Sequence, residues 1–254
     1  SKDKFGALVH ASVCRDFLEP ATANVVHDNL GLPPSCQVFD VSNACLGVLN
    51  GVLLLADMVE LGRIEAGVVV AGENGKPLVE NTVARLVADE SVTRKSLKAD
   101  FASLTIGSGA AAIVVANKDL APDAPQLRGA VVRAATEHNG LCRGGEAGGD
   151  AGVGSESQID MATDAEALLH AGIALAQTAW AQARTELGFT ERAPDRVITH
   201  QVGMAHHHAL LASLELDPET SFTSYPDFGN IGSVSWPLTL FKAAEAGFVK
   251  KGDE

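Results

Sequence analysis

The chain has 254 residues, of which 46% are hydrophobic and only 5% aromatic. That length is enough for one large α/β domain or two similar halves, with a core of aliphatic side chains and alanine. A net charge of −13 argues against broad binding to nucleic acid or to an acidic membrane. No signal peptide or membrane-spanning run is visible, and four cysteines without a CxxC pair favour a reducing cytosol over a disulfide framework or a zinc site. The first residue is a serine, which indicates a processed, trimmed or incompletely represented chain.

The first 71 residues alternate between predicted strands and helices. Apolar runs predict strands at 7–13, 37–41 and 66–71. Helices are expected at 19–30 and 46–61, and each is followed by a glycine. The second helix is apolar on nearly every face, which predicts that it is buried. The order β-α-β-α-β is typical of a parallel sheet with helices on its faces.

The rest of the chain continues this mixed pattern. Further strands are predicted at 104–106, 110–115, 126–136 and 196–199, and further helices at 164–187, 202–214 and 236–246. The glycine-rich segment 140–157 is predicted to be a mobile loop or lid, and 224–230 a loop. Gly-Ser-Gly at 107–109 predicts a tight turn rather than a phosphate-binding loop, because no lysine follows at the Walker spacing.

Cys45 stands where the predicted strand at 37–41 gives way to the helix at 46–61. The free N–H groups and the positive dipole end of a helix stabilise a thiolate. We therefore interpret Cys45 as a nucleophile that takes up an acyl group. The alternative is a small buried cysteine that packs between strand and helix.

Two other polar residues stand at comparable places. His200 follows the predicted strand at 196–199, and Asn230 lies between glycines just before a helix. Alone, each has a simpler reading, as a hydrogen-bonded or surface histidine and as a turn-forming asparagine. Together with Cys45 they form a set that suits acyl transfer, in which a thiolate attacks a thioester and N–H donors hold the carbonyl oxygen of a second substrate. The two halves of the chain are loosely alike, since in each a strand ends in a chemically capable residue and a helix follows.

Three adjacent histidines at 206–208 offer a possible metal cluster. They fall inside the predicted helix at 202–214, where consecutive side chains point about 100° apart. We therefore favour a helix face over a metal site.

Several short segments jointly resemble the thiolase-fold condensing enzymes of the ketoacyl synthase III branch, most closely the OleA type. The segments are Asn-Ala-Cys-Leu-Gly at 43–47, His-Gln at 200–201 and Phe-Gly-Asn-Ile-Gly-Ser at 228–233, with further similarity at 14–20, 104–110 and 225–230. The resemblance covers most of the chain. It implies a layered αβαβα fold of two pseudo-repeated halves, residues 1–137 and 138–254. It also implies that the first strand–helix units are missing, as is a last glycine-rich strand that supplies a second oxyanion-hole N–H.

The resemblance also implies an activity and residue roles. OleA-type enzymes are acyltransferases that join two fatty acyl-CoAs head to head in olefin and β-lactone biosynthesis, with CoA thioesters as substrates and no metal or other cofactor. Cys45 would accept the first acyl group, and His200 and Asn230 would polarise the carbonyl of the second. Glu19 would be the general base, acting in the site of a partner subunit. A cytoplasmic homodimer is implied, or a heterodimer with a related subunit.

The chemistry of this condensation gives Glu19 a separate rationale. Two plain acyl-CoAs carry no carboxylate to lose as CO₂, so a base must remove an unactivated α-proton, and a carboxylate in an apolar site suits that task. The alternative for Glu19 is a carboxylate placed at a helix start for the dipole. Two alternatives remain for the whole chain. One is a decarboxylative 3-oxoacyl synthase III that uses a malonyl thioester, and the other is a non-catalytic subunit of a heteromeric enzyme.

Overall fold

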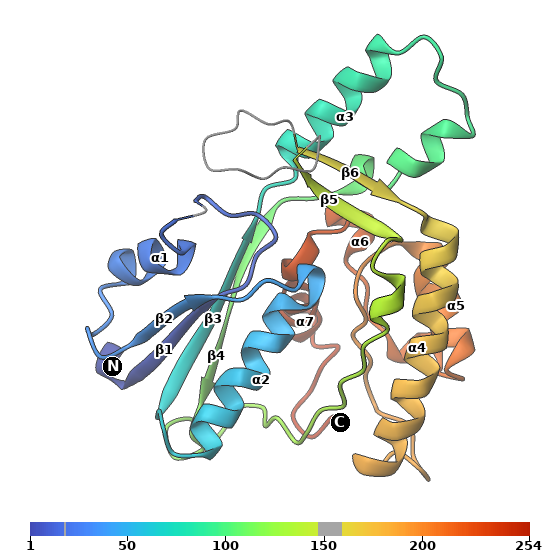
Figure 1. Cartoon of the computed structure of the whole chain (residues 1–254). Helices are drawn as coiled ribbons and strands as arrows, with labels where there is room; N and C mark the ends of the chain where they lie inside the picture. Colours follow the sequence, from blue (N-terminus) through green and yellow to red (C-terminus); the bar gives the residue numbers. More distant parts are fainter. Residues whose placement is uncertain (18, 147–158) are drawn as a thin grey trace. The chain divides into compact units, whose positions relative to one another are not determined.

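The computed structural model describes residues 1–17, 19–146 and 159–254, which form two compact units (Figure 1). Unit 1 comprises Ser1–Glu73, Ser108–Arg128 and Ile231–Asp253. Unit 2 comprises Asn74–Gly107, Gly129–Asn230 and Glu254. Both units are discontinuous in sequence. They are defined by internal contacts rather than by homology, so the expected division into halves 1–137 and 138–254 stays a prediction.

Unit 1 is built on a four-stranded sheet in the order β2-β1-β3-β4. The strands are β1 (Phe5–His10), β2 (Gln37–Asp40), β3 (Ala66–Glu73) and β4 (Gly109–Ala116). The first three are parallel and β4 runs antiparallel to β3. The predicted parallel sheet is therefore confirmed, although its first strand begins and ends a few residues earlier than expected. Because β1, β2 and β3 are parallel, the loops that follow them emerge at the same edge of the sheet.

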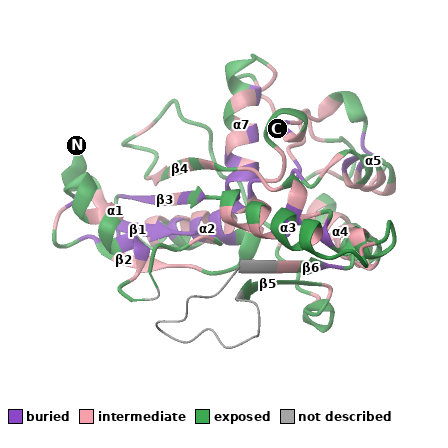
Figure 2. Ribbon diagram, turned by 90° about the horizontal axis from the view of Figure 1, so that it is seen from above, coloured by how far each residue is buried: buried purple, intermediate pink, exposed green. Residues whose placement is uncertain are grey.

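Helices cover both faces of this sheet. They are α1 (Thr22–Leu30), α2 (Gly47–Glu60) and α7 (Ser235–Glu245), with the 3₁₀ turns η1 (Lys2–Lys4), η2 (Ala44–Leu46) and η7 (Gly232–Val234). Side chains of β1 alternate between the faces, as strand geometry requires. Val9 packs in a cluster with Leu55 of α2, whereas Leu8 packs with Ala23 of α1. Figure 2 shows the buried residues concentrated along β1 and β3.

The helix α2 is less buried than its composition predicts. Its buried residues include Val48 and Leu55, but Leu54 keeps 43% of its surface exposed. Gly51 allows the close approach of this helix to the sheet, because a Cβ there would lie 2.8 Å from a methyl group of Val69. The prediction of a helix buried on every face is therefore wrong within the residues described.

Unit 2 combines helices with a small hairpin. Its helices are α3 (Lys76–Ala88), α4 (Ala165–Glu186), α5 (Met204–Ser213) and α6 (Tyr225–Phe228), its strands are β5 (Cys142–Glu146) and β6 (Ile159–Thr163), and its 3₁₀ turns are η3 (Ser96–Asp100), η4 (Ser103–Thr105), η5 (Thr136–His138) and η6 (Pro218–Thr220). The long helix α4 begins where Asp164 accepts a hydrogen bond from the N–H of Ala167 and ends before Gly188, whose φ is 86°. The helices α4 and α5 pack together, and α3 packs against β6.

Several predictions for unit 2 and its flanks are wrong. The predicted strand at 104–106 is the turn η4 plus one bridge at Ile106, the run at 126–136 is irregular, and 196–199 makes a single bridge at Val197. The loop predicted at 140–157 contains β5, and its remainder from 147 onward lies outside the described residues. The loop predicted at 224–230 contains α6. In the three false strands the apolar pattern is present, but regular pairing with a neighbouring strand is not formed in the described residues.

Two further features follow from the described residues alone. No helix among them combines the length and the hydropathy that a membrane-spanning segment needs. No disulfide joins any two of the four cysteines, all of which lie in the described ranges.

Candidate active site

Cys45 lies in the turn η2, between the end of β2 and the first residue of α2. The turn is closed by a 3.0 Å hydrogen bond from the N–H of Leu46 to the carbonyl oxygen of Asn43. Ala44 has a φ of 43°, a left-handed conformation that costs a residue with a Cβ about 1–3 kcal/mol and that clusters at functional sites. The cysteine is partly exposed rather than buried in the core. Its place therefore fits a thiol presented to a substrate better than the alternative of simple packing.

Gly47 explains why the helix can start so close to the sheet. A Cβ at this position would lie 2.6 Å from the carbonyl oxygen of Ala11, just beyond the end of β1. A side chain here would therefore push the first turn of α2, and Cys45 with it, away from the edge of the sheet. The positive end of the helix dipole at this first turn favours negative charge, which a thiolate supplies.

A buried carboxylate supports the same edge of unit 1. Glu73, at the end of β3, is only 8% exposed and accepts hydrogen bonds from the N–H groups of Val13 (2.9 Å) and Cys14 (3.1 Å). It also accepts from the N–H (3.2 Å) and the hydroxyl (2.7 Å) of Ser233 in η7, a turn that packs against η2. Gly232 has a φ of 53°, and a Cβ there would lie 3.0 Å from the carboxylate. Glu73 therefore joins the segment after β1 to the turn that supports Cys45.

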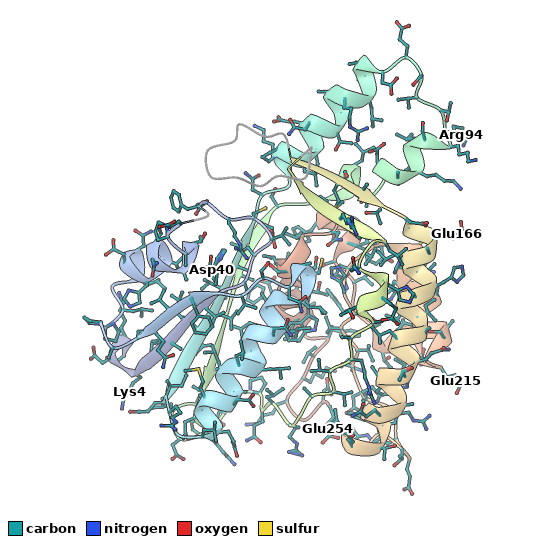
Figure 3. The ribbon with its side chains drawn as sticks, viewed as in Figure 1. Lys4, Asp40, Arg94, Glu166, Glu215 and Glu254 are labelled. Carbon is teal, nitrogen blue, oxygen red and sulfur yellow. The ribbon has the colours of Figure 1, made fainter. Side chains whose placement is uncertain are left out.

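Glu19 lies on the segment that connects β1 to α1 and is exposed. It precedes the N-cap residue Ala21, so α1 begins later than predicted. The N-terminus of α1 is held by Asp40, whose carboxylate accepts from the N–H groups of Thr22 (3.1 Å) and Ala23 (2.9 Å) and is labelled beside this helix in Figure 3. Since Asp40 fills the role of helix-start carboxylate, the alternative reading of Glu19 loses its main support. Glu19 and Cys45 follow adjacent parallel strands and therefore leave the sheet at one edge.

His200 belongs to unit 2, where it follows the bridge between Val197 and Ser221. Burial lowers the pKa of His200 from 6.5 to about 4, and the neighbouring His206 contributes further. His200 is therefore a neutral imidazole near pH 7, able to donate one N–H to a carbonyl oxygen without carrying a charge. Next to it, Thr199 Oγ1 and His207 Nδ1 lie 3.1 Å apart and share a hydrogen bond.

The histidines at 206–208 lie on α5, in agreement with a helix face. Burial lowers the pKa of both His206 and His207, with His208 adding to the effect on His207. Among the residues that the structure describes, no group of three or more histidine, cysteine, aspartate or glutamate side chains is arranged to hold a metal ion.

Asn230 also belongs to unit 2, and its backbone is fixed on both sides. Its N–H donates to the carbonyl oxygen of Thr105 (3.0 Å), and its carbonyl oxygen accepts from the N–H of Gly107 (2.8 Å). The preceding Gly229 has a φ of 66°, and a Cβ there would lie 2.4 Å from the carbonyl oxygen of Thr105. Only glycine fits this approach, so the Phe-Gly-Asn sequence is explained by local geometry.

One buried side chain links the His200 and Asn230 segments. Gln201 is 1% exposed and donates from Nε2 to the carbonyl oxygen of Thr199 (2.8 Å). Its Oε1 accepts from the N–H groups of Ser224 (2.8 Å) and Tyr225 (3.3 Å) at the start of α6. Neither Gln201 nor Glu73 was predicted to have a role. Glu73 stands just after the apolar run at 66–71, whereas Gln201 follows His200 and has no comparable signal in the sequence.

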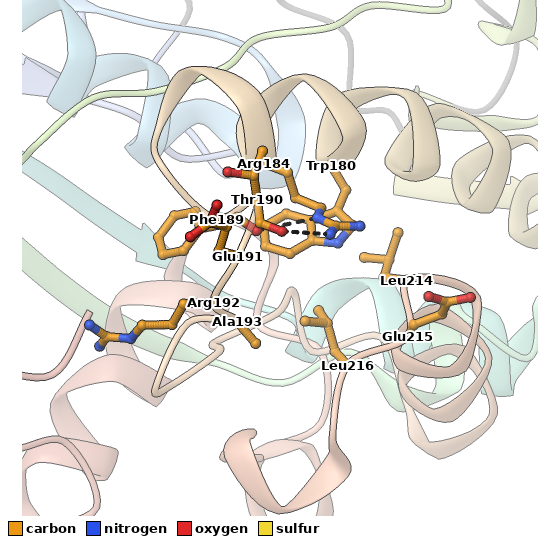
Figure 4. A pocket seen from close by; sticks show the side chains of 10 residues that line it. All are labelled: Trp180, Arg184, Phe189, Thr190, Glu191, Arg192, Ala193, Leu214, Glu215 and Leu216. Carbon is orange, nitrogen blue, oxygen red and sulfur yellow. Dashed lines mark hydrogen bonds between the residues drawn. The ribbon is translucent and has the colours of Figure 1, made fainter.

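Unit 2 also contains a pocket of about 160 Å³ that is separate from these residues (Figure 4). It is lined by Trp180, Arg184, Phe189, Thr190, Glu191, Arg192, Ala193, Leu214, Glu215 and Leu216. Arg184 donates to the carbonyl oxygens of Phe189 (3.3 Å) and Thr190 (3.1 Å), so its guanidinium is engaged within the fold. The volume of this pocket, about 160 Å³, is below the range of roughly 300–1,000 Å³ of typical small-molecule sites. None of the four predicted site residues lines it.

The predicted residues thus fall into two pairs. Cys45 and Glu19 belong to unit 1, and His200 and Asn230 belong to unit 2. Within unit 1 both residues stand on loops at one sheet edge, and within unit 2 both are tied to one hydrogen-bonded framework.

Comparison with known proteins places this fold and these motifs in one class. Residues 185–254 match the family model of the 3-oxoacyl-[acyl-carrier-protein (ACP)] synthase III C terminal. An acyl-CoA:acyl-CoA alkyltransferase of Xanthomonas campestris is 41% identical over 252 residues, covering 99% of this chain and 70% of that protein. The crystal structure of a cysteine-to-serine variant of Xanthomonas campestris OleA with bound lauric acid and lauroyl-CoA matches with a TM-score of 0.87 and 41% identity, over 99% of this chain and 71% of that one. A glutamate-to-glutamine variant of the same OleA matches with a TM-score of 0.88 and 41% identity, over 99% of this chain and 69% of that one.

These matches define a thiolase-fold condensing enzyme of the ketoacyl synthase III branch. Within that branch, the chain belongs to the OleA-type acyl-CoA:acyl-CoA alkyltransferases, a family of acyltransferases. It spans about 70% of the length of the relatives it matches.

Proposed function

We propose that this chain catalyses the non-decarboxylative Claisen condensation of two fatty acyl-CoAs through an acyl-Cys45 intermediate. The observation that carries the proposal is the partly exposed Cys45 on a left-handed turn at the start of α2, in a chain of the OleA family. A relative with bound lauric acid and lauroyl-CoA supports fatty acyl-CoA as the substrate class.

In the first half-reaction the Cys45 thiolate attacks the thioester carbonyl of an acyl-CoA. The bond between the acyl carbon and the sulfur of CoA breaks, and CoA leaves as a thiolate that takes a proton from solvent. The helix start at η2 and α2 stabilises the thiolate before attack.

In the second half-reaction Glu19 removes the α-proton of a second acyl-CoA. The resulting enolate carbon attacks the carbonyl of acyl-Cys45, a carbon–carbon bond forms, and the Cys45 thiolate is released. His200, neutral because burial lowers its pKa to about 4, donates a hydrogen bond to the enolate oxygen together with Asn230. The product is a 2-alkyl-3-oxoacyl-CoA, and hydrolysis of its thioester by water gives the free acid.

The sequence spacing supports the role of Glu19. The glutamate and the cysteine substituted in the solved OleA variants are separated by the same number of positions as Glu19 and Cys45. The exposed place of Glu19 ahead of α1 suits a side chain that reaches into the site of a second subunit. We therefore propose a homodimer in which each subunit supplies the base for its partner.

Mass spectrometry of the intact protein tests the nucleophile. Incubation with lauroyl-CoA is expected to add one lauroyl group to the wild-type chain and none to Cys45→Ala. Cys142→Ala removes the exposed cysteine of β5 and is the matched control, which should be acylated like the wild type. Acylation of Cys45→Ala, or none of the wild type with any acyl-CoA, would sink the proposal.

The base requires a separate experiment. Glu19→Gln is expected to keep acylation of Cys45 but to slow condensation by roughly 10²–10⁴-fold, the usual contribution of a general base. Wild-type condensation by this variant would remove Glu19 from the mechanism.

A decarboxylative reaction is the second candidate, favoured by the match to the synthase III family model. In that reaction malonyl thioester loses CO₂ to give the carbanion, and no base is needed at the α-carbon. Dependence of turnover on a malonyl thioester, with release of CO₂, would favour it over the acyl-CoA reaction.

A further inference from the structure

We infer that Gln201 is a positioning residue that sets the geometry between His200 and Asn230, an inference that rests on the proposed function. The side chain touches no proposed reacting atom, so it acts through the two segments that it joins. These segments are 23 positions apart along the chain, at Gln201 and Ser224.

Gln201 lies directly beside His200 in the sequence. Thr199 and Gln201 flank His200, and the Gln201 side chain folds back to donate to the carbonyl oxygen of Thr199 (2.8 Å). The hydroxyl of Thr199 is in turn bonded to His207 of α5 (3.1 Å). The backbone on either side of His200 is therefore held by buried groups, because Thr199 is 9%, Gln201 1% and His207 6% exposed.

Gln201 is also connected to Asn230 through the helix α6. Gln201 Oε1 accepts from the N–H groups of Ser224 and Tyr225, which are orphan donors at the start of the short helix α6. The helix ends at Phe228, and the chain then passes through Gly229 to Asn230, whose backbone is already fixed on Thr105 and Gly107. Gln201 therefore anchors one end of the segment and the loop at 105–107 anchors the other.

The amide of Gln201 is the group that makes both connections. A glutamine carries a donor and an acceptor on one rigid group, and this site uses both. Methionine matches its length but makes neither bond. Glutamate keeps the acceptor, but when it is ionised its second oxygen faces the carbonyl oxygen of Thr199. Since burial and the facing carbonyl both favour the protonated form, a glutamate here becomes a donor again as the pH falls.

The test compares Gln201→Met, Gln201→Glu and the wild type in both half-reactions with lauroyl-CoA. Acylation of Cys45 is expected to stay within about twofold of the wild type, whereas condensation by Gln201→Met falls by roughly 10–100-fold, as for a misplaced catalytic group. Condensation by Gln201→Glu, divided by the wild-type rate at each pH, should rise as the pH is lowered from about 8 to about 6. A purely structural role would instead lower both half-reactions together.

Gln177→Met is the matched control. Gln177, on α4, is exposed and donates to the carbonyl oxygen of Ser213 (3.2 Å), so the same chemical change is made at a site outside the proposed machinery. Amide hydrogen exchange at residues 222–230 is the second readout, and it should speed up in Gln201→Met but not in Gln177→Met.

The outcomes separate the two hypotheses. Wild-type condensation by Gln201→Met overturns the inference about Gln201 and leaves the proposed function intact. If the wild type itself takes up no acyl group, the proposed function fails, and the positioning role of Gln201 in condensation fails with it. Unchanged exchange at 222–230 in Gln201→Met refutes the structural link in either case.

Discussion

Removal of the Glu73 carboxylate is the sharpest test of how unit 1 holds the Cys45 turn. Glu73→Ala takes away an acceptor that three backbone N–H groups and one hydroxyl share. Each buried donor left without a partner costs about 1–3 kcal/mol of stability, but the donors nearest the surface can hydrogen-bond to water instead. With a remaining exposure of only 8% at Glu73, we expect a loss of about 3–5 kcal/mol in the free energy of unfolding.

Glu73→Gln refines the prediction. The amide oxygen can still accept from Val13 and Ser233, but its NH₂ group then faces the N–H of Cys14. One donor–donor contact replaces one hydrogen bond, so the expected loss is smaller, about 1–3 kcal/mol.

Urea denaturation gives the measurement, with stability compared at equal m values. Glu65→Ala is the matched control, because Glu65 is exposed and forms a surface ion pair with Lys4 (2.6 Å), which is worth less than about 1 kcal/mol. If Glu73→Ala costs no more free energy of unfolding than Glu65→Ala, the four hydrogen bonds to Glu73 do not stabilise the fold.

Three further predictions concern single residues. Asp40→Ala removes the acceptor for the first N–H groups of α1 and should lower stability by about 1–2 kcal/mol in urea, while Asp40→Asn, which keeps one acceptor, should lose less. Gly229→Ala should impair condensation but not acylation of Cys45, because the new Cβ would lie 2.4 Å from the carbonyl oxygen of Thr105. Gly188→Ala is the control and should leave condensation unchanged, because Gly188 also has a positive φ (86°) but no atom lies near its Cβ position. The folded-state pKa of His200, about 4, lies below its ordinary 6.5, so the unfolded chain binds the proton first and the stability contributed by neutral His200 is lost as the pH falls from 6.5 to 4. The stability difference between wild type and His200→Asn should therefore shrink across that window, and a constant difference would contradict the burial of His200.

The parts of the fold that could be read from the sequence are those whose signal is local. The strands β1 to β3 are short, mostly apolar runs, and each of the two helices between them is closely followed by a glycine, so their order alone predicted a parallel sheet. The helix α3 (Lys76–Ala88) was missed because its apolar pattern is weak and its buried face is small, with Thr82 as its buried residue. The false strand at 126–136 has the right residues but no regular partner in the described structure, and pairing depends on distant segments.

Some residues of the candidate site could likewise be predicted from the sequence, and others could not. Cys45 could be found because a strand end and a helix start are adjacent in sequence, and the left-handed Ala44 adds a feature that no pattern encodes. Glu73 and Gln201 could not be given roles, because each acts on partners far away in sequence, Ser233 and Ser224 respectively. A side chain that accepts distant backbone N–H groups has no periodic signature, so only the folded structure shows what it holds.

The two buried acceptors, Glu73 and Gln201, lead to different expectations for the two half-reactions. Glu73 ties the backbone at 13–14, which leads toward Glu19, to the turn at 232–234, which packs against the turn of Cys45. Its loss should therefore disturb both the acylation of Cys45 and the proton transfer assigned to Glu19. Gln201 holds only segments of unit 2, so its loss should spare acylation and slow condensation. Equal effects of Glu73→Gln and Gln201→Met on both half-reactions would contradict the proposal that unit 1 supplies the nucleophile and unit 2 activates the carbonyl group.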